Sequence, residues 1–267
     1  MNTRLAIVIG LILCGSNLAT AAAATDPRSA AVRAEAETMF EVGESFDEGR
    51  GVSSDPRRAF DWYTRAASLG HVESMNRLGL LYSDGSGVPQ DYAAALEWYR
   101  RAAEHGSEPA VSNIATLYFY GLGVGQSYAK AAGLLQAAAQ RGSADAQNKL
   151  GTLYEEGLGL EQDQAQAREL FRKAATQGYA PAMVNLGRMY AEGIGGERDD
   201  VGGYALIQAA VNAGVPASIR AVALTELRRV SDRLEDVQLT RAQSLAREPF
   251  ATIDARMQAG ADAPDHG

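Results

Sequence analysis

The apolar residues of this chain fall into short stripes that alternate with glycine. Within residues 74–109, Met75, Leu78 and Tyr82 are spaced by three and four, which predicts the buried face of a short helix. Gly85 follows where this helix should end, because glycine readily takes the positive φ of a helix C-cap. The stretch therefore opens with a helix and a glycine-rich turn.

A second helix is expected in the same stretch. Asp91 is placed to accept hydrogen bonds from the first free backbone N–H groups of a helix, as an N-cap residue does. Ala95, Trp98 and Ala102 then mark an apolar face, and Gly106 is placed to end the helix. One unit is thus a helix, a turn, a second helix and a second turn.

The whole unit returns along the chain at a spacing of 36 residues. Tyr82 recurs as Tyr118, Tyr154 and Tyr190, with Phe46 in the first copy. The turn glycines keep the same register in five copies, as Gly49, Gly85, Gly121, Gly157 and Gly193 and as Gly70, Gly106, Gly142, Gly178 and Gly214. A fixed period of this size is typical of repeat proteins, in which stacked units bury a core that one unit cannot bury alone.

Small residues inside the predicted helices indicate that neighbouring helices approach closely. One helix position is glycine in four copies and alanine in the third, as Gly43, Gly79, Ala115, Gly151 and Gly187. Glycine within a helix costs about 1 kcal/mol relative to alanine, so its return suggests a packing reason. Trp62 and Trp98, followed by leucines in later copies, are expected to fill the space between successive pairs.

The motif L-G-x-x-Y-x-x-G-x-G-V, followed by D and then A-x-x-W-Y-x-x-A-A-x-x-G, resembles the Sel1-like repeat, a relative of the tetratricopeptide repeat. It is carried by Leu78, Gly79, Tyr82, Gly85, Gly87, Val88, Asp91, Ala95, Trp98, Tyr99, Ala102, Ala103 and Gly106. The resemblance implies an all-α fold, a right-handed α-solenoid of five helix–turn–helix repeats that serves as an interaction scaffold. The fifth copy departs most from the pattern, at Gly196, Gly202, Gly203 and Val211, so its second helix is expected to be the least secure.

The pattern divides the chain after residue 24 into three parts. Residues 25–217 form the predicted Sel1-like solenoid, with repeats at about 38–73, 74–109, 110–145, 146–181 and 182–217. Residues 218–250 keep an apolar stripe but lose the glycines, so they are expected to form C-terminal capping helices with a polar outer face. Residues 251–267 are poor in apolar residues and are expected to form a mostly disordered tail.

The first 24 residues have the pattern of a secretory signal peptide. Arg4 supplies the positive charge, an apolar run reaches Cys14, and small residues follow, with cleavage expected near Ala24. The run is short for a transmembrane helix, so no stable membrane insertion is expected after processing. A lipoprotein at Cys14 is the alternative, but Leu13 is not the small residue that such signals place before the cysteine. The predicted location is periplasmic or secreted.

The sequence offers no constellation for catalysis or for a cofactor. The formal net charge of −8 and the lack of a basic stripe argue against nucleic acid as a partner. His71, His105 and His266 lie apart, so no metal site is predicted. The turn glycines lack the Lys-Ser or Lys-Thr of a phosphate loop, and adjacent acids such as Glu155 and Glu156 point different ways on a helix. The chain is therefore predicted not to be an enzyme and to take no cofactor.

The predicted binding surface is the concave face, which the first helices line in tetratricopeptide-like arrays. By that analogy, the ends of the first helices contribute Asp47, Glu48, Asp84, Phe119, Tyr120, Glu155, Glu156 and Glu192. Phe119 and Tyr120 stand where the other copies place mostly acids, and aromatic residues are enriched at binding hot spots. The alternative is that these two rings pack on the adjacent turn. A groove of this composition suits a basic segment of a partner that carries one apolar anchor.

Two functions fit such a surface. The first is an exported protein–protein interaction scaffold or adaptor that binds or regulates an envelope protein. The alternative is a periplasmic immunity or inhibitor protein that neutralises a toxin enzyme, since exported proteins with this type of repeat include both kinds. In either case the partner is another protein, and the chain itself is expected to be a monomer.

Overall fold

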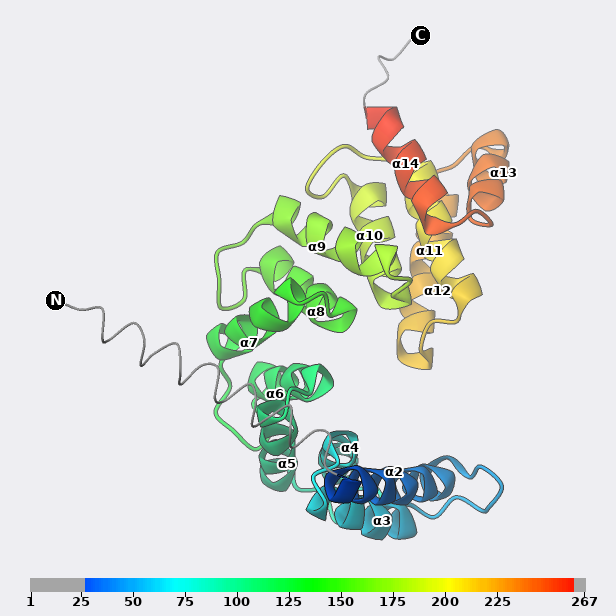
Figure 1. The fold of residues 1–267 in the computed structure, drawn as a ribbon. Coiled ribbons are helices and arrows are strands. Elements are labelled where there is room, and N and C mark those ends of the chain that lie inside the picture. The colour runs from blue at the N-terminus through cyan, green and yellow to red at the C-terminus, as the bar shows by residue number, and fades with distance from the viewer. Residues whose placement is uncertain (1–26, 262–267) are drawn as a thin grey trace, which may run out of the picture. The chain divides into compact units, whose positions relative to one another are not determined.

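A computed structural model describes residues 27–261, and this part of the chain consists of thirteen α-helices with no strand (Figure 1). The predicted all-α solenoid is confirmed. The helices divide between two compact units, with the boundary between Ala110 and Val111. The predicted signal peptide, residues 1–24, and the last part of the predicted tail, residues 262–267, lie outside the described residues.

Each unit is built from helices that follow one another in short order. The first unit holds α2 (Pro27–Glu48), α3 (Pro56–Ser68), α4 (Val72–Asp84) and α5 (Tyr92–Glu104). Helix α6 (Glu108–Tyr120) begins at the end of this unit and continues into the second. The second unit goes on with α7 (Tyr128–Gln140), α8 (Ala144–Glu156), α9 (Gln164–Thr176), α10 (Ala180–Glu192), α11 (Asp200–Ala213), α12 (Ala217–Ser231), α13 (Asp236–Leu245) and α14 (Phe250–Ala261).

The helix ends predicted from the turn residues are confirmed. The carboxylate of Asp91 accepts hydrogen bonds from the backbone N–H groups of Ala93 and Ala94, at 2.9 and 3.0 Å, and so starts α5. Gly85 closes α4 in the left-handed conformation, with φ of 70°, and its N–H donates to the carbonyl oxygen of Leu81. These caps satisfy backbone groups that a helix end leaves free, which is why similar turn residues return in each copy.

The two helices of a repeat approach most closely at the repeated glycine. The buried ring of Tyr99 on α5 lies over Gly79 of α4 and leaves no room for a Cβ there. Phe171 of α9 covers Gly151 of α8 in the same way, with ring atom Cε1 2.8 Å from the place of a Cβ. Trp98, expected to fill the space between successive pairs, is half-buried, and the next residue, Tyr99, carries the ring that packs within the repeat.

The departures in the fifth copy have a packing reason. A Cβ on Gly203 of α11 would lie 2.6 Å from the carbonyl oxygen of Gly187 on α10, so glycine lets these two helices meet at their backbones. Gly202 makes room for Met257 of α14, whose Cγ is 2.7 Å from the place of a Cβ. Although the pattern predicts its helix to be the least secure, α11 is a full helix of 14 residues with many buried side chains.

The C-terminal helices extend the core of the last repeat. Leu227 and Val230 of α12, Leu245 of α13 and Ile253 of α14 are buried in one apolar cluster with Ile207 of α11. The polar outer face expected of a cap agrees with this arrangement, since other residues of α12 and α13 are exposed.

Helix α14 corrects the prediction of a mostly disordered segment at residues 251–267. Its apolar residues are few, but Ile253 and Met257 are spaced by four and both are buried. The space that Gly202 leaves on α11 receives Met257, so the docking of α14 depends on a residue far from it in sequence. Low apolar content alone therefore underestimates the order of this segment.

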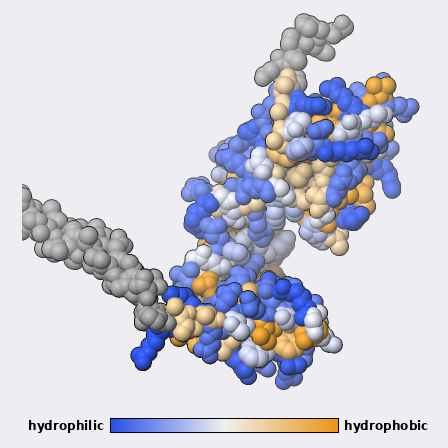
Figure 2. Space-filling view, turned by 45° about the vertical axis from the view of Figure 1, so that its right-hand side comes forward, coloured by the Kyte–Doolittle hydropathy of each residue, from blue (hydrophilic) through white to orange (hydrophobic). Residues whose placement is uncertain are grey.

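Within residues 27–261, no helix is both long enough and apolar enough to cross a membrane. The longest described helix is α2, with 22 residues, and charged side chains occur along its length. On the face shown in Figure 2, hydrophilic residues predominate and hydrophobic patches lie between them.

Candidate interaction site

A hollow of about 240 Å³ opens on the second unit, beside the aromatic pair of the third repeat. We call it the third-repeat hollow. It is lined by Ala115, Thr116, Phe119 and Tyr120 of α6, Leu135 of α7, and Lys149 and Thr152 of α8. Because α6 and α8 are the first helices of successive repeats, the hollow lies on the side of the unit where the sequence predicts a binding groove.

The hollow arises because the third repeat departs from the first, second and fourth repeats at two packed positions. In the fourth repeat, the ring of Phe171 lies over Gly151. In the third repeat, Ala115 and Leu135 hold the equivalent positions, and both are buried. A leucine side chain is shorter than an aromatic one, so the space that a ring fills in the fourth repeat is left open in the third.

The two residues of the aromatic pair differ, because Phe119 is packed and Tyr120 is exposed. Phe119 is half-buried, and its ring makes edge-on contacts with Tyr120 and Tyr128, at centroid distances of 4.8 and 5.1 Å. Packing on the adjacent turn, the alternative interpretation of the sequence, thus describes Phe119 in part. Tyr120 is different, because 63% of its surface is exposed and it stands at the edge of the hollow.

Lys149 brings a positive charge to the hollow and is already paired. Its Nζ lies 3.0 Å from the carboxylate of Asp145 and donates a hydrogen bond to the Ser112 hydroxyl at 3.1 Å. Ser112 and Tyr179 donate hydrogen bonds to the same carboxylate. Burial disfavours the charged form of Asp145, but Lys149 and these hydrogen bonds outweigh burial, so the pKa of Asp145 lies below its ordinary value. The network joins α6, α8 and the N-cap residue of α10, and it holds Lys149 in the lining of the hollow.

Two of the predicted acids on the second unit are neutralised by arginines that follow them by about one repeat length, in the fifth repeat and in the C-terminal cap. Arg188 donates hydrogen bonds to both carboxylate oxygens of Glu155, at 2.6 and 2.7 Å. Glu192 is paired with Arg229, and Arg233 lies 3.7 Å from it. Such bidentate and charge-assisted bonds hold neighbouring repeats in register. They also remove most of the negative charge that the sequence predicts for this part of the groove.

The third predicted acid of the second unit, Glu156, is exposed. It forms no ion pair with any residue in the described part of the chain. It follows Thr152 by one turn of α8, so both side chains lie on the same face of that helix. Glu156 is therefore the acid best placed to meet a cation bound beside the hollow.

The other three predicted residues belong to the first unit. Asp47 accepts a hydrogen bond from the Tyr63 hydroxyl at 3.3 Å. Glu48 is exposed and lies 2.9 Å from Arg50. Asp84 is exposed at the end of α4. The eight predicted residues are thus divided between two units, and the structure brings only Phe119 and Tyr120 together in one hollow.

Five residues of the hollow were not among the predicted site residues. They are Ala115, Thr116, Leu135, Lys149 and Thr152. The signal was present, because the third copy has alanine at the glycine position and leucine at the aromatic position. This pair predicts a hollow only once the ring of another copy is known to lie over its glycine, which the spacing of residues alone does not show.

The chemistry of the hollow suits binding. Its lining combines apolar side chains with two threonine hydroxyl groups and one amine, which is held by Asp145. Among residues 27–261, no group of three or more histidine, cysteine, aspartate or glutamate side chains is arranged to hold a metal ion. The arrangement fits an inserted side chain better than proton transfer.

The fold and this surface define an α-solenoid of stacked helix pairs. Five Sel1 repeats match the family model, over residues 36–71, 72–107, 109–143, 144–179 and 180–215. The chain belongs to the Sel1 repeat family. Proteins of this family are protein–protein interaction scaffolds, and their fold is a non-enzymatic one.

Solved structures show the same fold. A protective antigen from uropathogenic Escherichia coli shares 29% sequence identity with a TM-score of 0.70, and the match covers 84% of this chain and 48% of that protein. This chain therefore spans about half of that protein's length. A Sel1 repeat protein from Oxalobacter formigenes shares 31% identity with a TM-score of 0.66, over 79% of this chain and 87% of that one. A comparison with curated proteins found no match.

An immunity protein from Pseudomonas aeruginosa is a more distant neighbour. It shares 19% identity with a TM-score of 0.36, over 77% of this chain and 83% of that one. A likeness of this size carries no argument about the role of this chain. The immunity role stays a hypothesis that rests on the sequence resemblance.

Proposed function

We propose that this chain is an exported scaffold that binds another protein through the third-repeat hollow, with Tyr120 and Phe119 as its main contact residues. The observation that carries the proposal is that an exposed aromatic ring lies beside a hollow. Interface hot spots concentrate where an aromatic or aliphatic anchor fills a pocket. An apolar side chain of the partner would enter against Leu135 and Ala115, and the Tyr120 ring would cover it.

The size of the hollow sets the kind of anchor. At about 240 Å³, it accepts one large side chain and not a whole ligand of drug size, which needs roughly 300–1,000 Å³. Burying one such apolar side chain contributes about 1.5–3 kcal/mol. The rest of the affinity would come from contacts around the rim, as in a peptide or loop laid across successive first helices.

The charges around the hollow favour one orientation of a basic partner. Glu156 is exposed on one side, whereas Lys149 lies in the wall. A basic residue beside the anchor would therefore lie toward Glu156. Glu155 contributes less attraction than its sequence position suggests, because Arg188 already neutralises it.

Export and the absence of catalysis are parts of the same proposal. Export rests on the signal peptide pattern of residues 1–24, with its charge, apolar run and small residues. A binding role without catalysis is supported by the scaffold nature of the family and by a hollow whose amine is held in an ion pair. The proposed location is periplasmic, where the partner would be an envelope protein.

The double variant Phe119→Ala, Tyr120→Ala is expected to lose most of its binding to the native partner. Truncation of a hot-spot aromatic costs about 2 kcal/mol or more, so the affinity should fall at least thirtyfold. Proteins retained from a periplasmic extract by the unaltered chain are identified first, and their affinity is then measured by calorimetry. Helical content should stay unchanged, because Tyr120 is exposed, Phe119 is only half-buried, and both lie in the last turn of α6.

The matched control is Val222→Ala, Leu224→Ala. These residues are two exposed apolar side chains of α12 that do not line the hollow. The control should bind as the unaltered chain does. If the aromatic double variant folds normally and keeps the same affinity, binding through the third-repeat hollow is refuted.

A further inference from the structure

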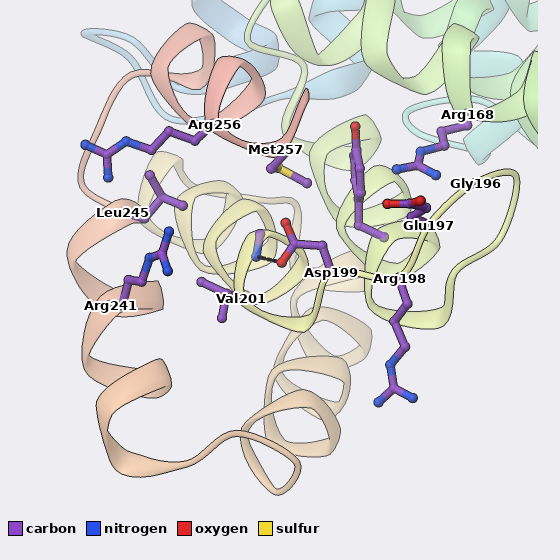
Figure 3. A pocket seen from close by; sticks show the side chains of 12 residues that line it. Arg168, Gly196, Glu197, Arg198, Asp199, Val201, Arg241, Leu245, Arg256 and Met257 are labelled. Carbon is purple, nitrogen blue, oxygen red and sulfur yellow. Dashed lines mark hydrogen bonds between the residues drawn. The ribbon is translucent and has the colours of Figure 1, made fainter. Parts of the chain in front are cut away.

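A second and larger cavity, of about 470 Å³, lies where the C-terminal helices meet the fifth repeat (Figure 3). We call it the Arg168 pocket. Its lining comes from α9, α10, the turn before α11, α11 itself, α13 and α14. It shares no lining residue with the third-repeat hollow, and its volume is in the range of small-molecule sites. Nothing in the repeat pattern requires a cavity here.

Arginine dominates the chemistry of this pocket. Four of its twelve lining residues are arginines, Arg168, Arg198, Arg241 and Arg256, in a chain whose net charge is −8. In the view of Figure 3, Arg168 lies to the right of the pocket, whereas Arg241 and Arg256 lie to its left, with Leu245 between them. Arg198 is engaged elsewhere, since its Nη2 lies 2.7 Å from Asp200. Arg168, Arg241 and Arg256 form no ion pair with any residue between 27 and 261.

The acids in the lining do not cancel this charge. Asp199 accepts a hydrogen bond at 2.8 Å from the backbone N–H of Gly202, as the N-cap of α11. The start of that helix therefore satisfies its carboxylate. Glu197 is exposed at the rim, next to the turn glycines. Apart from the Arg198–Asp200 pair, the lining holds three arginines and two carboxylates, so its charge stays positive.

Comparison of the repeats with one another shows that Arg168 is an unusual feature. The same helix position is apolar or aromatic in every other copy, as Phe60, Leu96, Ala132 and Tyr204. Residue 196 changes together with it, since this turn position is Val52, Val88, Val124 and Leu160 elsewhere and glycine only here. The guanidinium group of Arg168 occupies the place where a Cβ of residue 196 would stand. Glycine in the turn therefore makes the room that the arginine needs.

The guanidinium group of Arg168 is held without being neutralised. It stacks on the ring of Tyr190, 3.6 Å from the ring centroid, and Tyr190 is buried. Stacking on a ring fixes the plane of the group and leaves its N–H donors, which lie in that plane, available to a ligand. Planar guanidinium donors match the geometry of phosphate and carboxylate oxygens.

We propose that the Arg168 pocket binds a small organic anion, in which a phosphate or carboxylate group is carried on a partly apolar body. Arg168 anchors the anionic group, and Arg241 and Arg256, on the other side of the pocket, add positive potential at longer range. Leu245 and Met257 provide the apolar wall for the body of the ligand. Since α13 and α14 supply two of the arginines, an occupied pocket holds these helices against the fifth repeat and stabilises the folded chain.

The experiment uses the full chain with three probes, inorganic phosphate, phenyl phosphate and benzoate, at constant ionic strength. Calorimetric titration should give saturable binding of phenyl phosphate or of benzoate that is tighter than binding of inorganic phosphate, because the ring adds apolar contacts. The probe that binds tells a phosphate ligand from a carboxylate ligand. The same probe should raise the melting temperature.

Arg168→Leu restores the residue type of the second repeat and is expected to weaken this binding at least tenfold. Arg241→Leu, on the surface of α13, should weaken it by a smaller factor and carries little risk to folding. Arg220→Leu is the matched control, because it removes one exposed positive charge of the same unit outside the pocket. The proposal is overturned if no probe binds saturably at millimolar concentration, or if all three variants weaken binding equally.

Discussion

A chain that ends at Val215 is expected to lose the ordered structure of its last helix pair, α10 and α11. The truncation removes α12, α13 and α14, whose residues Leu227, Val230 and Ile253 are buried in one cluster with Ile207. Each large aliphatic side chain contributes about 1.5–3 kcal/mol when buried. Losing several of them removes a large fraction of the roughly 5–15 kcal/mol that stabilises a domain.

Hydrogen exchange on α10 and α11 measures this effect. Protection should fall first in α11 and then in α10, because each repeat is stabilised by its neighbour. A chain that ends at Ala261 keeps α14 and is the control, with protection expected to equal that of the full chain. Equal protection in the two truncated chains would show that the C-terminal helices do not cap the solenoid.

Gly203→Ala is expected to lower the free energy of unfolding by about 2 kcal/mol, although alanine is the better helix former. The added Cβ would stand 2.6 Å from the carbonyl oxygen of Gly187 and 2.9 Å from the backbone nitrogen of Ala191. These are backbone atoms, which cannot rotate away as a side chain can. The helices α10 and α11 would have to separate, and packing along their whole contact would loosen. Chemical denaturation of the full chain measures the change.

Gly133→Ala is the matched control for this variant. Gly133 lies within α7, and a Cβ there would meet nothing within 4 Å. The same substitution should therefore raise the free energy of unfolding, by up to about 1 kcal/mol, through helix propensity alone. The two variants should differ in sign. Equal effects would mean that close approach of α10 and α11 is not the reason for glycine at position 203.

The elements that the sequence predicts correctly are those with local causes. Asp91 caps a helix through its own side chain, and Gly85 ends one through its own φ, so each can be recognised without knowledge of its neighbours. The 36-residue register then carries these caps from copy to copy. A fold made of such units follows almost entirely from its repeat pattern.

The features that the sequence does not predict depend on contacts between distant residues. Met257 of α14 is buried because Gly202 leaves space for it, so the ordered part of the tail depends on a position three helices earlier in the chain. The charge of the predicted groove was overestimated for a similar reason. The sequence pattern predicts an unpaired Glu155 on the groove, but in the structure Arg188 donates a hydrogen bond to it. The two residues lie 33 positions apart, so the pattern does not show that they meet.

The candidate site falls between these two cases. Phe119 and Tyr120 stand out in the sequence because other copies place mostly acids there. The hollow beside them depends on what is missing, namely the ring that Phe171 provides in the next repeat and Leu135 does not. A missing side chain has meaning only against a known packing arrangement, so the structure was needed to find it.

The most direct test of binding through the third-repeat hollow is to fill it. The double variant Ala115→Gly, Leu135→Phe copies the Gly151 and Phe171 pair of the fourth repeat, so it should fold with a similar melting temperature. Leu135→Met, which keeps the side-chain volume nearly constant, is the control. Affinity for the partner, measured by calorimetry, should fall at least tenfold in the filled variant and stay within twofold in the control. Unchanged affinity in a filled variant that folds normally would contradict the account.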